Sequence, residues 1–344
     1  MNPPRVTVMM SVHNGGCWLR AAIDSVLAQT WRDFEFLILD DASTDDSVAQ
    51  ISAVSDPRIR LIRLPENIGL TRSLNCGLRA ARGEIIARQD SDDLSTPDRL
   101  GQQITFLDRH PEVAVVGAQA RLIDADGRSR GDRDLPLKPA SVRWLSLFDN
   151  PVIHTAATFR TKFIREDLGG YDESFPCVQD YELWTRVMPR KEVRNLRERL
   201  VQVREHSSSI SATRKAEASA MVERVVRRLA PEFSDEEVAL VCAFRRHLQP
   251  EEVTAFRNVL ARWDTMRPAG DARSQEDLEL TRALVLVRVG YNLLTRDRRL
   301  ALRQIADAVR AYPRVKRHIP WLRVAALFVL GERVRQLMAR VAGR

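Results

Sequence analysis

Three carboxylates follow one short stretch of this chain within four positions. Residues 85–89 read Ile-Ile-Ala-Arg-Gln, and Asp90, Asp92 and Asp93 come directly after them. Carboxylates at this spacing repel one another, and a divalent cation, which prefers oxygen ligands, relieves that repulsion. The same residues also suit a solvated turn that caps a following helix. The stretch by itself leaves both interpretations open.

The elements that must position these acids alternate along the first ninety or so residues. Buried strands are expected at residues 6–12, 34–39, 59–64 and 85–89, because each is a mostly apolar run rich in β-branched residues. Apolar residues at helical spacing lie between these runs. The alternation predicts an α/β fold with a mostly parallel, Rossmann-like sheet flanked by helices.

In parallel sheets of this kind, ligands bind outside the carboxyl ends of the strands. The polar residues that follow the four strands are therefore expected at one edge, and they are His13, Asn14, Asp41, Asn67 and the three acids. The sequence contains no G-x-G-x-x-G after the first strand and no P-loop motif, so neither nucleotide-binding fold is supported. Bound phosphates would then be neutralised by a metal rather than by glycine amides.

Weaker signals continue to residue 213. The expected elements are a helix over 96–109, a strand over 113–123, a turn at 126–127, a charged loop over 128–140 and a helix near 179–187. Asp180 lies in the first turn of that last helix. A carboxylate is favoured there by the helix dipole, which is a sufficient structural reason for the residue.

Length and composition describe an ordinary globular protein of more than one domain. The chain has 344 residues, and its four scattered cysteines form no C-x-x-C pair, so we expect reduced thiols in a cytoplasmic protein. Residues 1–12 do not resemble a signal peptide, and no apolar run reaches the roughly 20 residues that span a bilayer. The net charge of +8 comes without a nucleic-acid-binding motif, so no nucleic acid partner is expected.

The pattern changes near residue 214. Strand signals stop and amphipathic helices follow, which predicts two domains, 1–213 and an all-helical 214–344. Residues 320–341 place apolar side chains among arginines. That composition fits a helix lying on an anionic membrane surface, so peripheral attachment to the inner face of the cell membrane is one expectation. Packing against the other C-terminal helices is the alternative.

Six motifs in order resemble the family 2 glycosyltransferases of the GT-A fold over roughly residues 5–210. They lie at residues 6–14, 39–45, 67–84, 90–93, 179–184 and 206–211. The chain departs from the family at His13, where tyrosine is more usual, and at Gln179, where an acid is. Processive members resemble one another in a Q-x-x-R-W motif and several membrane spans, and neither occurs here. The resemblance therefore implies a non-processive bacterial type.

The resemblance implies a donor site for a nucleoside-diphosphate sugar, UDP- or dTDP-linked, with Mn²⁺ or Mg²⁺. Asp92 would be the main metal ligand, Asp90 would assist from the ribose or metal side, and Asp93 would support the loop. His206 would complete the metal site, although a surface loop histidine is the plainer interpretation. The remaining donor-binding residues would be Ser11, His13, Asn14, Asp41 and Asn67, with Asp41 accepting hydrogen bonds from the base and His13 stacking on it.

A sugar acceptor must lose a proton as it attacks, and Asp180 is the expected general base. Gln179 removes a like charge beside it, which would lower the pKa of Asp180. A single displacement with inversion follows from the resemblance. The expected acceptor is a saccharide hydroxyl, displayed on a lipid carrier, and the sequence makes no prediction of the oligomeric state.

Two other functions use similar residues. A sugar nucleotidyltransferase also has acids at strand ends, although it would need a glycine-rich, basic first loop, which residues 13–16 fit poorly. A non-catalytic saccharide-binding or protein-binding module could keep the same fold. Release of nucleoside diphosphate, of pyrophosphate, or of neither separates the three.

Overall fold

The computed structural model describes residues 3–209, 213–246, 248–266, 272–294 and 296–318. Its internal contacts divide the chain into two compact units. The first unit comprises residues 1–142 and 150–225, and the second comprises residues 143–149 and 226–344.

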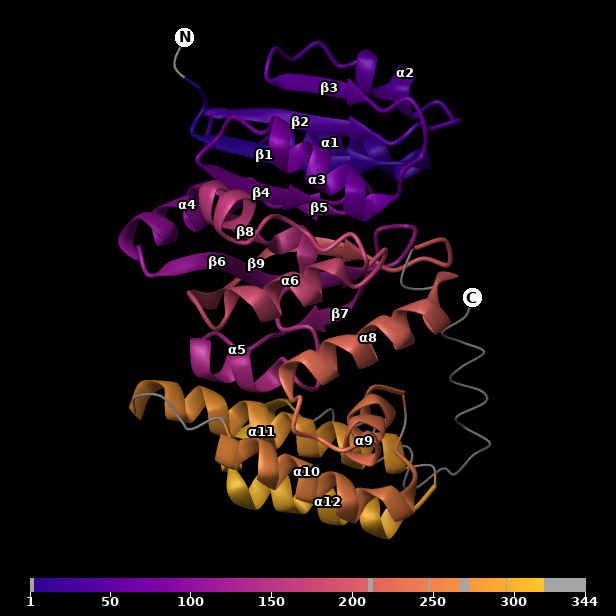
Figure 1. The fold of residues 1–344 in the computed structure, drawn as a ribbon, viewed down its shortest axis with the longest axis vertical. Helices are drawn as coiled ribbons and strands as arrows, with labels where there is room; N and C mark the ends of the chain where they lie inside the picture. Colours follow the sequence, from indigo (N-terminus) through magenta and orange to yellow (C-terminus); the bar gives the residue numbers. More distant parts are fainter. Residues whose placement is uncertain (1–2, 210–212, 247, 267–271, 295, 319–344) are drawn as a thin grey trace. The chain divides into compact units, whose positions relative to one another are not determined.

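A mixed sheet forms the centre of the first unit, as Figure 1 shows. Its first four strands are β1 (Val6–Val12), β2 (Phe34–Asp40), β3 (Ile59–Arg63) and β4 (Ile85–Gln89). They pair in parallel in the order β3-β2-β1-β4, so their carboxyl ends lie along one edge. The alternation of apolar runs and helices thus predicted this part of the fold correctly.

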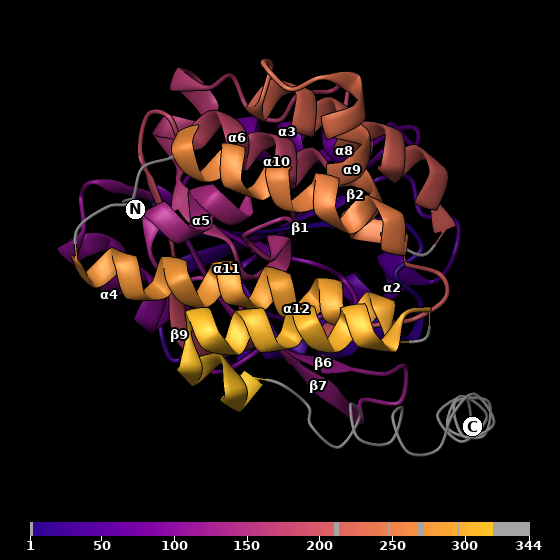
Figure 2. The ribbon, with the colours of Figure 1, turned by 90° about the horizontal axis from the view of Figure 1, so that it is seen from below.

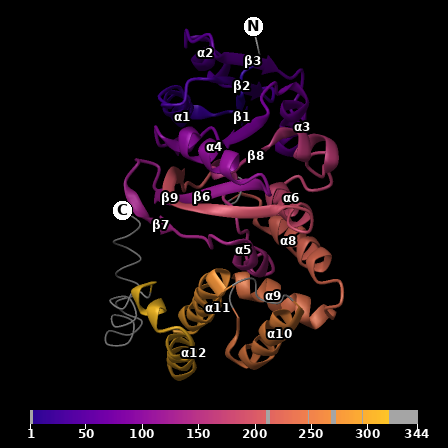
Figure 3. The same ribbon diagram turned by 90° about the vertical axis from the view of Figure 1, so that its left-hand side faces the viewer.

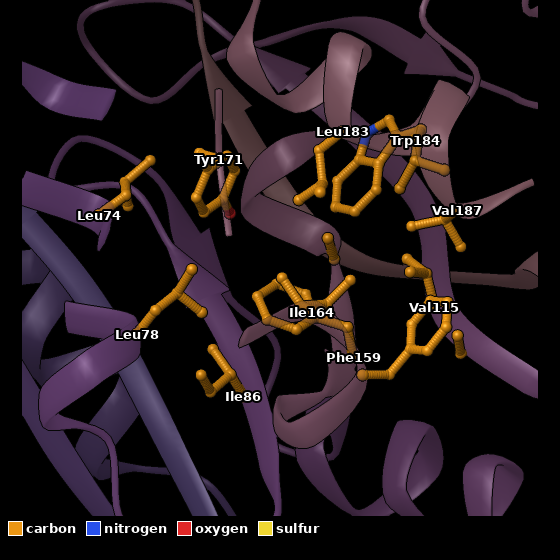
Figure 4. Packing of buried hydrophobic residues seen from close by; sticks show 14 of the residues in the cluster. Leu74, Leu78, Ile86, Val115, Phe159, Ile164, Tyr171, Leu183, Trp184 and Val187 are labelled. Carbon is orange, nitrogen blue, oxygen red and sulfur yellow. The ribbon is translucent and has the colours of Figure 1, made fainter. Parts of the chain in front are cut away.

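Helices cover both faces of this sheet (Figure 3). One face packs against α1 (Leu19–Leu27), α2 (Ser47–Ser52) and α4 (Arg99–Arg109). The other face packs against α3 (Leu70–Ala80) and α6 (Gln179–Val187). Figure 4 shows the second core, where Leu74 and Leu78 of α3 lie with Trp184 of α6 among the buried side chains.

The sheet continues through strands from later in the chain. They are β5 (Leu94–Ser95), β6 (Val113–Ile123), β7 (Ser129–Arg133), β8 (Thr158–Arg160) and β9 (Glu192–Arg204). The order beyond β4 is β8-β6-β9-β5, with β7 paired to β6. Strand β8 is antiparallel to both β4 and β6. The sheet is therefore mixed at this end and parallel at the other.

Two strands differ from the sequence prediction. Residues 128–140 were expected to be a loop, but Ser129–Arg133 forms β7, which pairs antiparallel with β6. All five of its residues are exposed, so there was no apolar pattern to detect. The thirteen-residue β9 was not predicted, because charged residues interrupt its alternation and residues 197–199 are exposed.

The second unit is helical in its described part, as expected. After α8 (Lys215–Leu229), which lies mostly in the first unit, come α9 (Asp235–Arg246), α10 (Val253–Met266), α11 (Ala272–Leu293) and α12 (Arg298–Ala311). Helices α11 and α12 lie side by side (Figure 2). Aromatic side chains fill the core of this unit, with the Phe244 and Phe256 rings stacked at 5.1 Å.

The proposed membrane segment, residues 320–341, lies outside the described residues. Within the described ranges, no helix combines the length and the apolar character needed to cross a bilayer.

Candidate active site

The three acids after β4 differ in their surroundings. Asp90 pairs with the guanidinium of Arg88, and its backbone N–H donates to Thr155 Oγ1 at 3.1 Å. Asp93 is buried, and one of its carboxylate oxygens accepts from the Arg204 N–H at 2.8 Å. Burial, together with the charges of Asp92 and Asp90, raises the pKa of Asp93 well above its usual range. Asp93 thus joins the loop of residues 90–93, here called the acid loop, to the end of β9.

Asp92 and His206 come together across the fold. Nε2 of His206 lies 2.8 Å from Oδ2 of Asp92, and Nδ1 lies 2.8 Å from the Ser208 hydroxyl. The His206 ring packs on Trp18, with 4.3 Å between ring centroids. Trp18 is held in turn, because its indole N–H donates to the Ala125 carbonyl at 3.1 Å. The imidazole is therefore oriented from two sides, and Trp18 is a site residue that the sequence analysis missed.

The predicted metal ligands are Asp90, Asp92 and His206. Among the described residues no three histidine, cysteine, aspartate or glutamate side chains form a ready-made metal cluster. Asp92 and His206 nevertheless bring a carboxylate oxygen and an imidazole nitrogen within 2.8 Å of each other. Mg²⁺ in enzymes is bound through one or two carboxylates with substrate phosphates and water completing the shell, so this pair fits a cation that arrives with a diphosphate. The metal site stays a prediction.

The loops after β1 and β2 are joined by hydrogen bonds at the same edge of the sheet. Asn14 has a left-handed backbone with φ 54°, and its side-chain oxygen accepts from the Thr44 N–H at 2.8 Å. Nδ1 of His13 lies 2.9 Å from the Asp41 carbonyl oxygen. Asp41 is buried, and its two carboxylate oxygens accept from the N–H groups of residues 68 and 69, each at 2.9 Å.

The other two predicted donor residues have partners nearby. The Ser11 hydroxyl lies 2.8 Å from that of Ser73, and the Asn67 side chain accepts from the Gly69 N–H at 3.0 Å. Gly69 has φ 85°, a conformation that favours glycine, as the chain turns into α3. The strand-end rule therefore placed His13, Asn14 and Asp41 together correctly, whereas Ser11 lies within β1. Their contacts are within the protein, and their roles toward a nucleotide stay predictions.

Asp180 lies in the first turn of α6, and Asn150 donates to its Oδ2 at 2.7 Å. Burial raises the pKa of Asp180 above its usual value despite that hydrogen bond. The lowering expected from Gln179, relative to an acid at that position, stays a prediction, and burial sets the net direction of the shift. Val178, directly before the helix, has φ 63° and ψ 13°. This left-handed conformation is costly for a β-branched residue and fixes the start of the helix.

Asp180 lies close enough to the acid loop to interact with it electrostatically. The negative charges of Asp92 and Asp180 both raise the pKa of Asp90, after the larger effect of burial, while Arg88 opposes them. Charges interact in this way only over short distances in a protein. The chain thus brings the Asp180 carboxylate near the acids that follow β4, and such a group of carboxylates with an imidazole suits both a cation-bound donor and a proton acceptor.

Comparison with known proteins identifies the family. Residues 7–167 match the family model described as glycosyl transferase family 2. EpsE of Bacillus subtilis is 35% identical over 241 residues, which cover 67% of this chain and 85% of EpsE. The chain belongs to glycosyltransferase family 2. The amylovoran biosynthesis glycosyltransferase AmsE of Erwinia amylovora is a second relative of this family 2 enzyme, 30% identical over 199 residues, 57% of this chain and 74% of AmsE.

Solved structures support the GT-A fold of this glycosyltransferase. S. aureus TarS 1-349 in complex with UDP-GlcNAc aligns over 91% of this chain and 92% of its own, with a TM-score of 0.54 at 15% identity. The mannosyltransferase PcManGT of Pyrobaculum calidifontis, in complex with GDP-Man and Mn²⁺, aligns over 98% of this chain and 84% of its own, with a TM-score of 0.54 at 18% identity. At such identities the likeness shows the fold alone.

Proposed function

We propose that this family 2 glycosyltransferase transfers a sugar from a nucleoside-diphosphate donor to a hydroxyl of a saccharide acceptor, with a divalent cation bound at Asp92 and His206. The observation that carries the proposal is the 2.8 Å contact between these two side chains. Beside them lies Asp90, whose pKa is raised in part by the negative charge of Asp180. The fold neighbours TarS and PcManGT were solved with UDP-GlcNAc and with GDP-Man and Mn²⁺, which supports this class of donor.

Asp92 and His206 would hold the cation, and Asp90 would assist from the ribose or metal side. When bound, the cation would offset the negative charge of the departing diphosphate. Asp41, with Ser11, His13, Asn14 and Asn67, would hold the nucleoside at the same edge. The proposed donors are UDP-, dTDP- and GDP-linked sugars.

Asp180 would take the proton of the acceptor hydroxyl. Burial raises the pKa of its carboxyl, and a less acidic carboxylate is the stronger base once ionised. Asn150 donates to one oxygen and so orients the other. This assignment corresponds to a single displacement with inversion of the sugar carbon.

The acceptor is proposed to be a saccharide on a lipid carrier, which would bring the enzyme to the inner face of the cell membrane. The apolar and arginine-rich residues 320–341 support this contact. Removal of residues 320–344 is expected to reduce sedimentation with vesicles containing phosphatidylserine. Equal sedimentation of the full chain and the shortened chain would contradict the membrane proposal.

The test of the main proposal is a donor screen. The full-length protein is incubated with UDP-GlcNAc, UDP-glucose, UDP-galactose, dTDP-rhamnose and GDP-mannose, each with Mn²⁺, Mg²⁺ or EDTA. Cation-dependent release of nucleoside diphosphate is expected, with water as a slow acceptor in the absence of a sugar. Release of pyrophosphate when a sugar phosphate is supplied with UTP would identify a nucleotidyltransferase instead. Binding of a saccharide without release of either product would identify a non-catalytic module.

A further inference from the structure

A buried arginine lies directly beneath the acid loop. Arg88 of β4 is 0% exposed, and its guanidinium donates to the carbonyl oxygens of Met9 at 2.7 Å and Gln89 at 2.6 Å. A third contact is made to Nε2 of His154 at 3.2 Å, and a fourth to the carboxylate of Asp90. Of these four partners, Asp90 is the carboxylate. A buried charge is tolerated when it is paired in this way.

The contact with Arg88 sets the protonation of His154. A guanidinium has N–H donors only, so Nε2 of His154 must accept and carries no proton. The Tyr171 hydroxyl lies 3.0 Å from the same nitrogen. Burial and the Arg88 charge hold the pKa of His154 well below its usual range, which agrees with a neutral ring. His154 therefore acts as a fixed acceptor rather than as a second cation.

Tyr171 anchors this arrangement to the rest of the first unit. Its backbone N–H donates to the Asn75 side chain at 2.9 Å, and its carbonyl accepts from the same side chain at 3.0 Å. The Tyr171 ring is buried in the core shown in Figure 4, with Leu74 and Leu183 among its labelled members. The phenol is thus held by packing as well as by hydrogen bonds.

These contacts form a continuous chain from α3 to the acid loop. The geometry points to Arg88 as a positioning residue for the Asp90 carboxylate, with His154 and Tyr171 positioning Arg88 in turn. The inference rests on the proposed function, which assigns Asp90 to the donor site. Held at a fixed place near Asp92 and Asp180, Asp90 would meet the incoming donor without reorganisation, which favours binding.

A double-mutant cycle tests this coupling. The variants Arg88→Met, Asp90→Asn and their combination are compared by the dissociation constant for the sugar nucleotide of the panel that wild type consumes fastest, with Mn²⁺. Each single change is expected to weaken binding by about tenfold, and the double variant to bind within about twofold of the weaker single variant, because each removes the same interaction.

Arg160 provides the matched control. Its guanidinium donates to backbone carbonyls, with Val113 at 2.9 Å and Leu107 at 2.8 Å, and the described structure gives it no carboxylate partner. Arg160→Met should lower stability while leaving donor affinity within about twofold. In the double variant with Asp90→Asn, the factors by which the two changes alter the donor dissociation constant should multiply. If the Arg88 and Asp90 effects also multiply, or if Arg88→Met binds donor normally, the inference is overturned.

Milder variants keep the test decisive if Arg88→Met fails to fold. His154→Leu removes the acceptor of Arg88, and His154→Gln keeps an acceptor in its amide oxygen. His154→Leu and Tyr171→Phe are expected to weaken donor binding, and His154→Gln to bind about as well as wild type. Equal affinity for the Leu and Gln variants would contradict the positioning role.

The result separates this inference from the proposed function. A wild-type protein that consumes no donor in the panel overturns both. An active wild type whose Arg88 and Asp90 effects multiply overturns only the positioning role.

Discussion

Nε2 of His206 and Oδ2 of Asp92 lie 2.8 Å apart although the two residues are separated by 114 positions. The contact joins the loop after β4 to the segment after β9. Because the Trp18 ring packs on the imidazole, the proposed donor would meet an oriented pair of side chains rather than two mobile ones.

The first prediction concerns cation-dependent donor binding. Asp92→Ala should abolish the increase in donor affinity that Mn²⁺ produces, because the main oxygen ligand is lost. His206→Ala should reduce that increase by about tenfold, in line with the loss of one ligand of a metal site. Isothermal titration with and without EDTA measures both. Asp98→Ala, which removes an exposed acid near the same loop, is the control. A Mn²⁺ effect that survives in Asp92→Ala would refute the ligand assignment.

The second prediction separates binding from turnover at Asp180. Asp180→Asn keeps the size of the side chain and loses the proton acceptor. Donor affinity should therefore stay within about twofold of wild type, while kcat falls by about 10²-fold to 10⁴-fold. Asp167→Asn makes the same change at an exposed aspartate outside the site and serves as the control. Loss of affinity and turnover to the same degree would show that Asp180 serves the donor rather than the acceptor.

The third prediction is the pH dependence of turnover. A general base works when ionised, and burial raises the pKa of Asp180 above that of an ordinary aspartate. Activity should therefore be lost, as the pH falls, at a higher pH than an ordinary aspartate would give. Asn150→Leu removes a hydrogen bond to the ionised form and should move this loss to higher pH still.

Thr185→Val is the matched control for the pH experiment. The Thr185 hydroxyl lies on the same helix, α6, and donates to the Glu182 carbonyl rather than to Asp180. Its pH profile of kcat should follow that of wild type. An unchanged profile in Asn150→Leu would mean that another group titrates.

The central fold followed from the sequence because parallel strands buried on both faces leave long apolar runs. Residues 6–12 and 85–89 have the predicted bounds in the structure. Strand β9 could not be found in this way, since Arg197, Glu198 and Arg199 interrupt it and are exposed. Its pairing with β6 depends on long-range backbone hydrogen bonds that no local pattern reports.

The candidate site was predicted where a residue follows a strand or lies in a family motif. Asp92 and His206 were expected to lie close together and do so, and Asp41 lies at the expected edge of the sheet. Arg88 was missed because an arginine within a strand signals nothing until its burial is known. His154 was passed over for a similar reason, since its partners are distant in sequence and appear only in the folded chain.

The last prediction uses the backbone before Asp180. Val178 adopts φ 63° and ψ 13°, which costs a non-glycine residue roughly 1–2 kcal/mol. Val178→Gly relieves this strain and should raise the free energy of unfolding by about 1 kcal/mol. The greater conformational entropy of glycine in the unfolded chain reduces that gain in part. The same freedom loosens the start of α6, so kcat should fall although stability rises. Val178→Ala keeps the strain and loses only side-chain packing, so it should be less stable than Val178→Gly in chemical denaturation. If the alanine variant is the more stable of the two, the strained backbone is not what fixes Asp180.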